Sequence, residues 1–185
     1  AWAGVAAQDA MPMGAAAFVA SWGLMMTAMM LPSAAPLVLV YRRSRAGLVA
    51  GYLAVWLATA VPAYAAAMLV PDSSRFLAAV LIAAGVYQLT PLKSACLRRC
   101  RSPLDFLMTR WRRGAVRVGL EHGAYCVGCC WSLMAVLVVA GAMSLAWAAA
   151  IAALVLAEKV APAGERVATV AGLALVAAGV VVAIP

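Results

Sequence analysis

Residues 115–140 read AVRVGLEHGAYCVGCCWSLMAVLVVA, a run in which apolar side chains dominate. At about 1.5 Å per residue, a helix of this length can cross a hydrocarbon core of roughly 30 Å. The whole chain has the same character, because 68% of its 185 residues are hydrophobic and only 11% are charged. These values lie far outside the range of soluble globular proteins. They predict an all-α, polytopic helical membrane protein.

Six apolar stretches are expected to form transmembrane helices. The predicted spans are residues 16–41, 47–70, 76–92, 115–140, 142–158 and 166–184, of which the fifth is short for a full crossing. A single transmembrane helical domain, residues 16–185, therefore follows an external lead-in of residues 1–15. Because the chain begins with Ala1 and not with methionine, we expect a preceding segment, either a cleaved signal peptide or one further helix.

The basic residues are distributed unequally between the two sides of these predicted helices. Thirteen of the fourteen Lys and Arg residues follow the first helix, occupy a basic loop near residues 93–117 or separate the last two helices, whereas Arg75 lies on the other side. Cytoplasmic loops of membrane proteins carry an excess of Lys and Arg. The pattern predicts a protein of the bacterial cytoplasmic membrane with cytoplasmic basic loops and with both termini of this chain outside. The net charge of +8 then points to the lipid bilayer as a partner and does not require nucleic acid.

One histidine and three of the five cysteines lie inside the run 115–140. They are His122, Cys126, Cys129 and Cys130. Residues three and four apart share a helix face, so these side chains can converge on one point. Imidazole and thiolate are ligands of copper and zinc. The alternative is that small side chains permit close helix packing here, but ionisable groups at membrane depth favour a functional role.

A second sulfur cluster lies in the first predicted helix. It consists of Met25, Met26, Met29 and Met30, which form two pairs spaced four residues apart. Thioether sulfur is a soft ligand that suits Cu(I), although methionine is also a flexible filler of apolar interfaces. Counted from the cytoplasmic ends of their helices, Met30 and Cys126 each lie at a depth of roughly 16 Å. We therefore expect the two clusters at one level of the membrane, with Met11 and Met13 as an external entry point for metal.

The remaining cysteines, Cys96 and Cys100, are four residues apart and flanked by arginines. The predicted orientation places them in the cytoplasm, where a stable disulfide is not expected. Two interpretations stay open. The pair has metal or redox use, or it lies on an amphipathic surface helix and is buried at the lipid boundary.

Four motifs carry a resemblance to a known family. They are MMLPSAAP at 29–36, YQLTPLK at 87–93 with Cys96, Cys100 and RSP at 101–103, HGAYCVGCCW at 122–131, and Glu158-Lys159. Together they resemble a bacterial domain-of-unknown-function family (DUF2182-like) of predicted metal-binding integral membrane proteins. The resemblance covers nearly the whole chain. It implies metal binding and one further helix upstream.

Three functions follow as hypotheses. The first is a copper handler that binds Cu(I) through Cys, His and Met ligands and hands it to a membrane metalloenzyme. The second is an accessory subunit of a membrane oxidase or monooxygenase complex, since helices rich in Ala and Gly suit contacts with other membrane subunits. The third is a membrane thiol-disulfide oxidoreductase that uses Cys126 and Cys129 as a Cys-x-x-Cys pair.

Of these hypotheses, the enzyme is the least favoured. Cys126 lies deep inside its predicted helix, and no other catalytic constellation is visible in the sequence. Copper is favoured over zinc as the metal, because the clustered methionines contribute nothing to a zinc site. Zinc stays the alternative.

Overall fold

The computed structural model describes residues 14–71, 73–110, 112–141 and 144–184. This part of the chain is all-helical, at 87% helix and without strands. Its helices are α2 (Ala15–Val40), α3 (Arg45–Ala58), α4 (Ala60–Leu69), α5 (Ser74–Gln88), α6 (Pro91–Arg101), α7 (Pro103–Met108), α8 (Ala115–Gly141), α9 (Leu145–Val160) and α10 (Gly164–Ala183). The predicted entry point at Met11 and Met13 lies outside the described residues.

The number of helices that could cross a membrane is smaller than the sequence predicted. By length and composition, four spans qualify in the described residues: α2, α3 together with α4, α8 and α10. A fifth exists only if α5 and α6, which are bent by 63° relative to each other, count as one span. Helix α9 has 16 residues, which at about 1.5 Å per residue is short of the membrane core. The all-helical fold is therefore confirmed, whereas the count of six spans is not.

The break between α5 and α6 has a local cause. Thr90 precedes Pro91 and has extended backbone angles (φ −75°, ψ 149°), because a residue before proline is disfavoured in the helical region. The Thr90 side chain accepts a hydrogen bond from the Lys93 backbone N–H at 3.3 Å and so caps α6, while proline suits the first helical position. Residues 91–101 of the predicted basic loop therefore form a helix, and this helix packs against α8.

Close packing of α3 against α8 brings aromatic and thiol side chains together. A Cβ atom at Gly51 of α3 would collide with the backbone oxygen of Val116, and one at Gly119 of α8 would collide with the backbone oxygen of Leu48. Only glycine allows the two backbones to approach so closely. The contact places Tyr52 on the His122 side of α8, with their ring centroids 5.8 Å apart.

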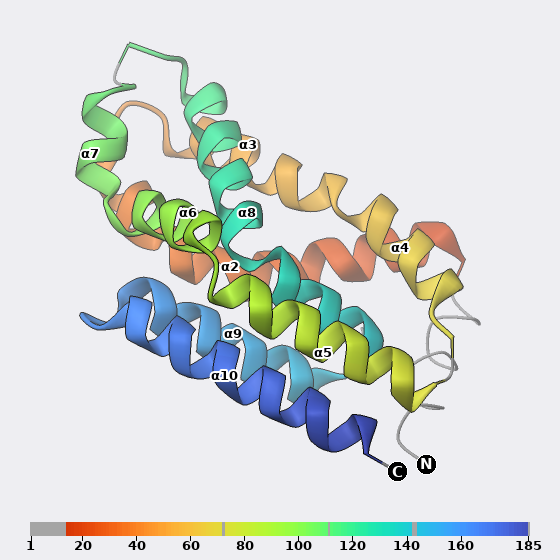
Figure 1. Ribbon diagram of the computed structural model, residues 1–185. Helices are drawn as coiled ribbons and strands as arrows, with labels where there is room; N and C mark the ends of the chain where they lie inside the picture. The colour runs from red at the N-terminus through yellow and green to blue at the C-terminus, as the bar shows by residue number, and fades with distance from the viewer. Residues whose placement is uncertain (1–13, 72, 111, 142–143, 185) are drawn as a thin grey trace.

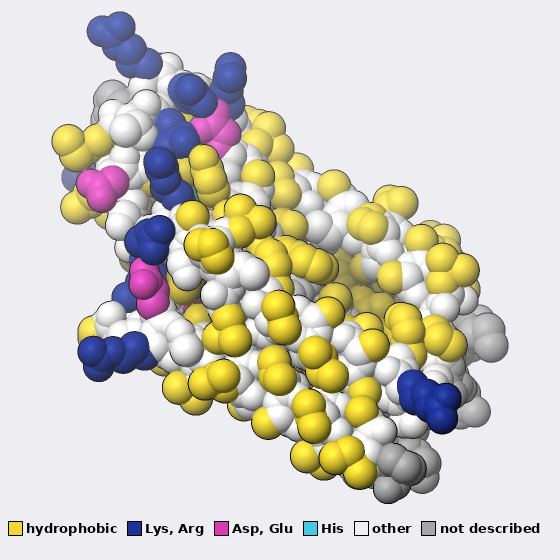
Figure 2. All heavy atoms as spheres, viewed as in Figure 1, with side chains coloured by type: hydrophobic (Ala, Val, Ile, Leu, Met, Phe, Trp, Pro, Cys, Tyr) yellow, Lys and Arg dark blue, Asp and Glu magenta, His cyan; other side chains and the backbone are white. Residues whose placement is uncertain are grey.

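Charged and apolar side chains occupy different parts of the surface. The connections α2–α3, α7–α8 and α9–α10 lie at one end of the molecule, and the α4–α5 connection and the C-terminus lie at the other (Figure 1). On the face in Figure 2, most Lys and Arg side chains gather at the first end, and hydrophobic side chains cover the body. The large exposed apolar side chains include Leu24 at 75%, Leu69 at 80% and Leu145 at 84% exposure.

Candidate metal centre

Three thiols converge inside the molecule on α8. The Sγ atoms of Cys126, Cys129 and Cys130 all lie within 4.8 Å of one another, and each cysteine is fully buried at 0% exposure. Their spacing of three and four residues puts them on one helix face. The predicted convergence is confirmed for these three residues, which we call the thiol cluster.

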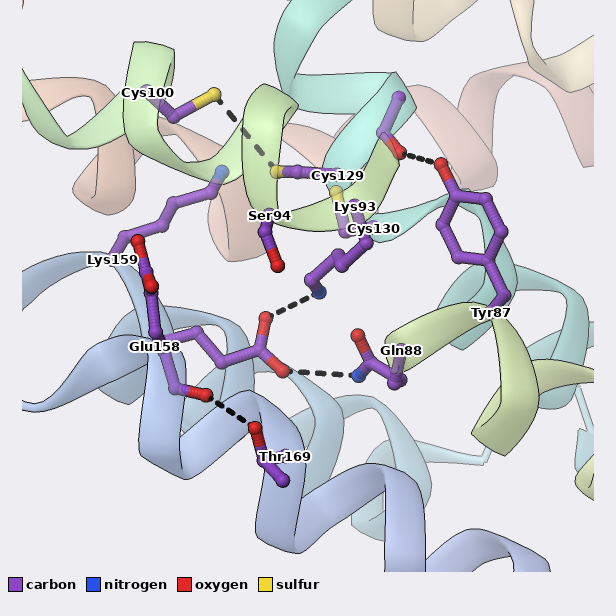
Figure 3. A network of polar contacts seen from close by, with 12 residues as sticks. Tyr87, Gln88, Lys93, Ser94, Cys100, Cys129, Cys130, Glu158, Lys159 and Thr169 are labelled. Atoms are coloured by element: carbon purple, nitrogen blue, oxygen red, sulfur yellow. Dashed lines mark hydrogen bonds and ion pairs between the residues drawn. The ribbon is translucent and has the colours of Figure 1, made fainter. Parts of the chain in front are cut away.

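A fourth thiol reaches this cluster from α6. Cys100 Sγ lies 3.9 Å from Cys129 Sγ (Figure 3), and Cys100 is buried. Cys96, one turn earlier, is only partly buried, and its sulfur faces the backbone of Gly128. Cys96 and Cys100 are therefore not a separate pair in a loop, because both pack against α8 and Cys100 extends the thiol cluster.

His122 lies outside the thiol cluster. Its ring packs between Phe106, at 5.2 Å between centroids, and Tyr52, at 5.8 Å. Its Nδ1 atom is buried and has no hydrogen-bond partner among the described residues. The neighbouring Glu121 does not orient it, because that carboxylate binds the guanidinium groups of Arg110, Arg113 and Arg117. Metal ligation by His122 stays a prediction.

The methionines of α2 share one apolar core with the thiol cluster. Met26, Met29 and Met30 are buried in this core, and Met25 packs against it. The Tyr52 hydroxyl donates a hydrogen bond to the Met30 carbonyl at 3.1 Å and lies 3.0 Å from Cys126 Sγ. Met30 and Cys126 are thus close to each other in space, and their common depth in a membrane stays a prediction. Ligation by the methionine sulfurs stays a prediction.

Lys159 of α9 points at the thiol cluster. Its ammonium group donates hydrogen bonds to Cys126 Sγ at 2.7 Å and to Ser33 Oγ at 3.0 Å. The side chain is buried, at 8% exposure. No carboxylate lies within salt-bridge distance of it in the part of the chain that the structure describes. A buried ammonium group next to a thiol stabilises the thiolate form, which is the form that binds metal.

The adjacent residue, Glu158, belongs to a different polar network. Its carboxylate accepts hydrogen bonds from Lys93 Nζ at 2.6 Å and from Gln88 Nε2 at 3.0 Å. All three side chains are buried, at 2% exposure or less. Arg101 donates to the Glu158 backbone carbonyl at 2.5 Å and so ties α6 to the end of α9. Figure 3 shows Glu158 turned toward Lys93 and Gln88, and Lys159 turned toward Cys100 and Cys129.

The burial of two lysines was not predicted from the sequence. Lys93 and Lys159 were expected among the charges of the basic loops, and this expectation is wrong, since the structure buries both. A signal was present, because Glu158 and Lys159 stand next to each other in one of the motifs of the family resemblance. An acidic and a basic residue side by side at the end of an apolar helix can turn in different directions and serve two sites.

The chemistry of this centre fits a soft metal ion. Thiolates select Cu(I), zinc and iron–sulfur clusters, and the thiol cluster belongs to a largely apolar core to which seven of the described helices contribute. The fold and the site define an all-helical protein with a buried, sulfur-rich cluster that could hold a metal ion.

The comparisons with known proteins narrow this class. The family model described as "PpoB2: Copper chaperone" matches residues 19–182. The chain belongs to this copper chaperone family. No curated protein and no solved structure matches the chain. Membership of a copper chaperone family and a buried thiol cluster agree with the predicted copper binding. The DUF2182-like name of the resemblance is not confirmed.

Proposed function

We propose that this protein is an integral membrane copper chaperone that holds Cu(I) on the thiol cluster and hands it to a membrane metalloenzyme. The observation that carries the proposal is the convergence of three fully buried sulfur atoms within 4.8 Å. A chaperone must bind its cargo tightly and still release it. Copper is therefore the cargo of this protein and not a resident cofactor.

The apolar surface of the candidate spans supports a location of the protein in the membrane. In the 18-residue windows of the four candidate spans, only 17–56% of the residues are buried within the molecule. In three of these spans at least two thirds of the residues are therefore not buried within the molecule, and lipid would cover their apolar side chains. In aqueous solution, large apolar patches would be exposed to water.

The Lys and Arg residues at one end of the molecule support an orientation of the protein in the membrane. Apart from the buried Lys93 and Lys159, the Lys and Arg residues predicted to be cytoplasmic lie near the connections α2–α3, α7–α8 and α9–α10, which share one end (Figure 1). We assign this end to the cytoplasmic face of the bacterial membrane. Cys126 lies three turns into α8 from this end. Copper would therefore be held within the membrane and not at its surface.

The donor atoms support Cu(I) over zinc. Structural zinc sites include sites with four cysteine ligands, so the thiols alone suit both metals, and the preference for Cu(I) comes from the methionines. Cu(I) is satisfied by thiolate and thioether sulfur. Buried methionine side chains occupy the same core as the thiols.

Cu(I) binding by the purified full chain tests the proposal. The wild-type protein is reduced in detergent and competes for Cu(I) with a colorimetric chelator. Its triple variant Cys126→Ser/Cys129→Ser/Cys130→Ser should bind Cu(I) more than about 100-fold more weakly, since loss even of a group that only orients a ligand costs roughly 10- to 100-fold.

The matched control is Cys96→Ser, which removes a partly buried thiol next to Gly128 that is not a member of the thiol cluster. This variant should bind Cu(I) as the wild type does. Equal Cu(I) binding by the triple variant and the wild type would contradict the proposed site.

A further inference from the structure

Burial of the Lys159 ammonium group is costly. A charged ammonium group in an apolar interior must be paired or strongly hydrogen-bonded to be tolerated. Its polar contacts are the sulfur of Cys126 and the hydroxyl of Ser33. Ser33 in turn donates to the Met30 carbonyl at 2.8 Å, so its oxygen is directed to accept from Lys159. These contacts hold the ammonium group in place, and its charge is balanced only when a thiolate lies beside it.

A metal complex on the thiol cluster would supply this negative charge. When two of the three clustered thiols are deprotonated and the third stays protonated, a Cu(I) ion with its ligands carries a net charge of −1, which the single positive charge of Lys159 balances. A Zn(II) ion on the same two thiolates is neutral, so the charge of Lys159 would stay uncompensated. In an interior of low dielectric constant, an unbalanced charge is strongly unfavourable.

We infer that Lys159 is the fixed countercharge of the copper site and that it favours a monovalent metal on two thiolates over a divalent one. This inference rests on the proposed function, because it assumes that the thiol cluster holds the metal. Lys159 acts through Cys126, which makes it a positioning and specificity-determining residue. The geometry fits this role, because the Lys159 ammonium group of α9 and the Tyr52 hydroxyl of α3 both lie within 3.0 Å of the Cys126 sulfur.

Three variants of the full chain test the role of Lys159. Lys159→Met keeps the length and apolar stem of the side chain and removes the charge, whereas Lys159→Arg keeps the charge. The double variant Lys93→Met/Glu158→Gln neutralises the other buried lysine together with its carboxylate. For each variant, competition with chromogenic chelators measures the affinity for Cu(I) and, separately, for Zn(II).

We expect Lys159→Met to bind Cu(I) roughly 10- to 100-fold more weakly and to bind Zn(II) no more weakly than the wild type. Lys159→Arg should restore most of the Cu(I) affinity. The double variant should leave the ratio of the two affinities unchanged, because its residues do not contact the thiol cluster. If Lys159 had only a structural role, Lys159→Met would lower the affinities for Cu(I) and for Zn(II) together.

The outcomes separate this inference from the proposed function. Failure of the wild type to bind Cu(I) would overturn both. Normal Cu(I) binding by the wild type together with an unchanged Cu(I)-to-Zn(II) ratio in Lys159→Met would overturn the countercharge alone. If Lys159→Met does not accumulate as folded protein, Lys159→Gln, which is polar and uncharged, is measured against Lys159→Arg. Equal ratios in these two variants would likewise overturn the inference.

Discussion

Lys93 and Lys159 are both buried lysines, but their partners differ. Lys93 forms an ion pair with Glu158 at 2.6 Å, and Gln88 binds the second oxygen of that carboxylate. Lys159 contacts a thiol and a hydroxyl instead. The first lysine is neutralised within the protein, whereas the second is fully neutralised only when a thiolate or an anionic metal complex lies beside it.

The difference indicates which polar group is structural and which is functional. A closed ion pair joins α6 to α9. The open partner set of Lys159 makes the thiol cluster sensitive to the charge of what it binds. Glu158 and Lys159 are adjacent on α9, but they belong to two different polar networks.

The largest expected effect is on the stability of the protein, when the ion pair between Lys93 and Glu158 is removed. Glu158→Ala leaves the ammonium group of Lys93 buried without its carboxylate, and we expect a loss of about 3–5 kcal/mol in the free energy of unfolding. Reversible unfolding in mixed detergent micelles measures this loss. Adding Lys93→Met to the Glu158 variant should recover much of the stability, since it removes the unpaired charge. A loss below about 1 kcal/mol would mean that the ion pair is not a structural element.

A smaller effect is expected at the thiol cluster, on the affinity for Cu(I). Tyr52→Phe removes the hydroxyl that joins the Met30 carbonyl to the Cys126 sulfur. One hydrogen bond contributes about 1 kcal/mol, so Cu(I) should bind about fivefold more weakly. The variant Tyr64→Phe is a matched control, because Tyr64 packs against Phe18, away from the thiols. Chelator competition measures both, and equal affinities of the two variants would show that the Tyr52 hydroxyl does not orient Cys126.

Much of the fold follows from features that are local in the sequence. Apolar length predicted α2, α8 and α10 to within two residues at each end. Gly141, the last residue of α8, has a φ of 120°, a conformation that favours glycine. The convergence of Cys126, Cys129 and Cys130 was predictable because helix periodicity alone places residues three and four apart together. Such features need no knowledge of which helices are neighbours.

The rest depends on contacts between distant segments, which periodicity does not encode. The approach of Cys100 to Cys129 requires the bend at Pro91 and the packing of α6 on α8. The burial of Lys159 requires α9 to pack against α2 and α8, and a lysine at the end of an apolar helix is normally exposed to water. A prediction from hydropathy therefore assigns both Lys93 and Lys159 to loops. The contact between Tyr52 and Cys126 depends on the glycine-mediated packing of α3 and α8.

The most direct test of the central claim is X-ray absorption at the copper edge of the copper-loaded wild-type protein, purified with its thiols reduced. The account predicts Cu(I) bound by sulfur atoms, with this signal lost in Cys126→Ser/Cys129→Ser/Cys130→Ser and retained in Cys96→Ser. Copper bound as Cu(II), or bound mainly by nitrogen and oxygen atoms, would contradict the assignment of the thiol cluster as the site that carries the metal.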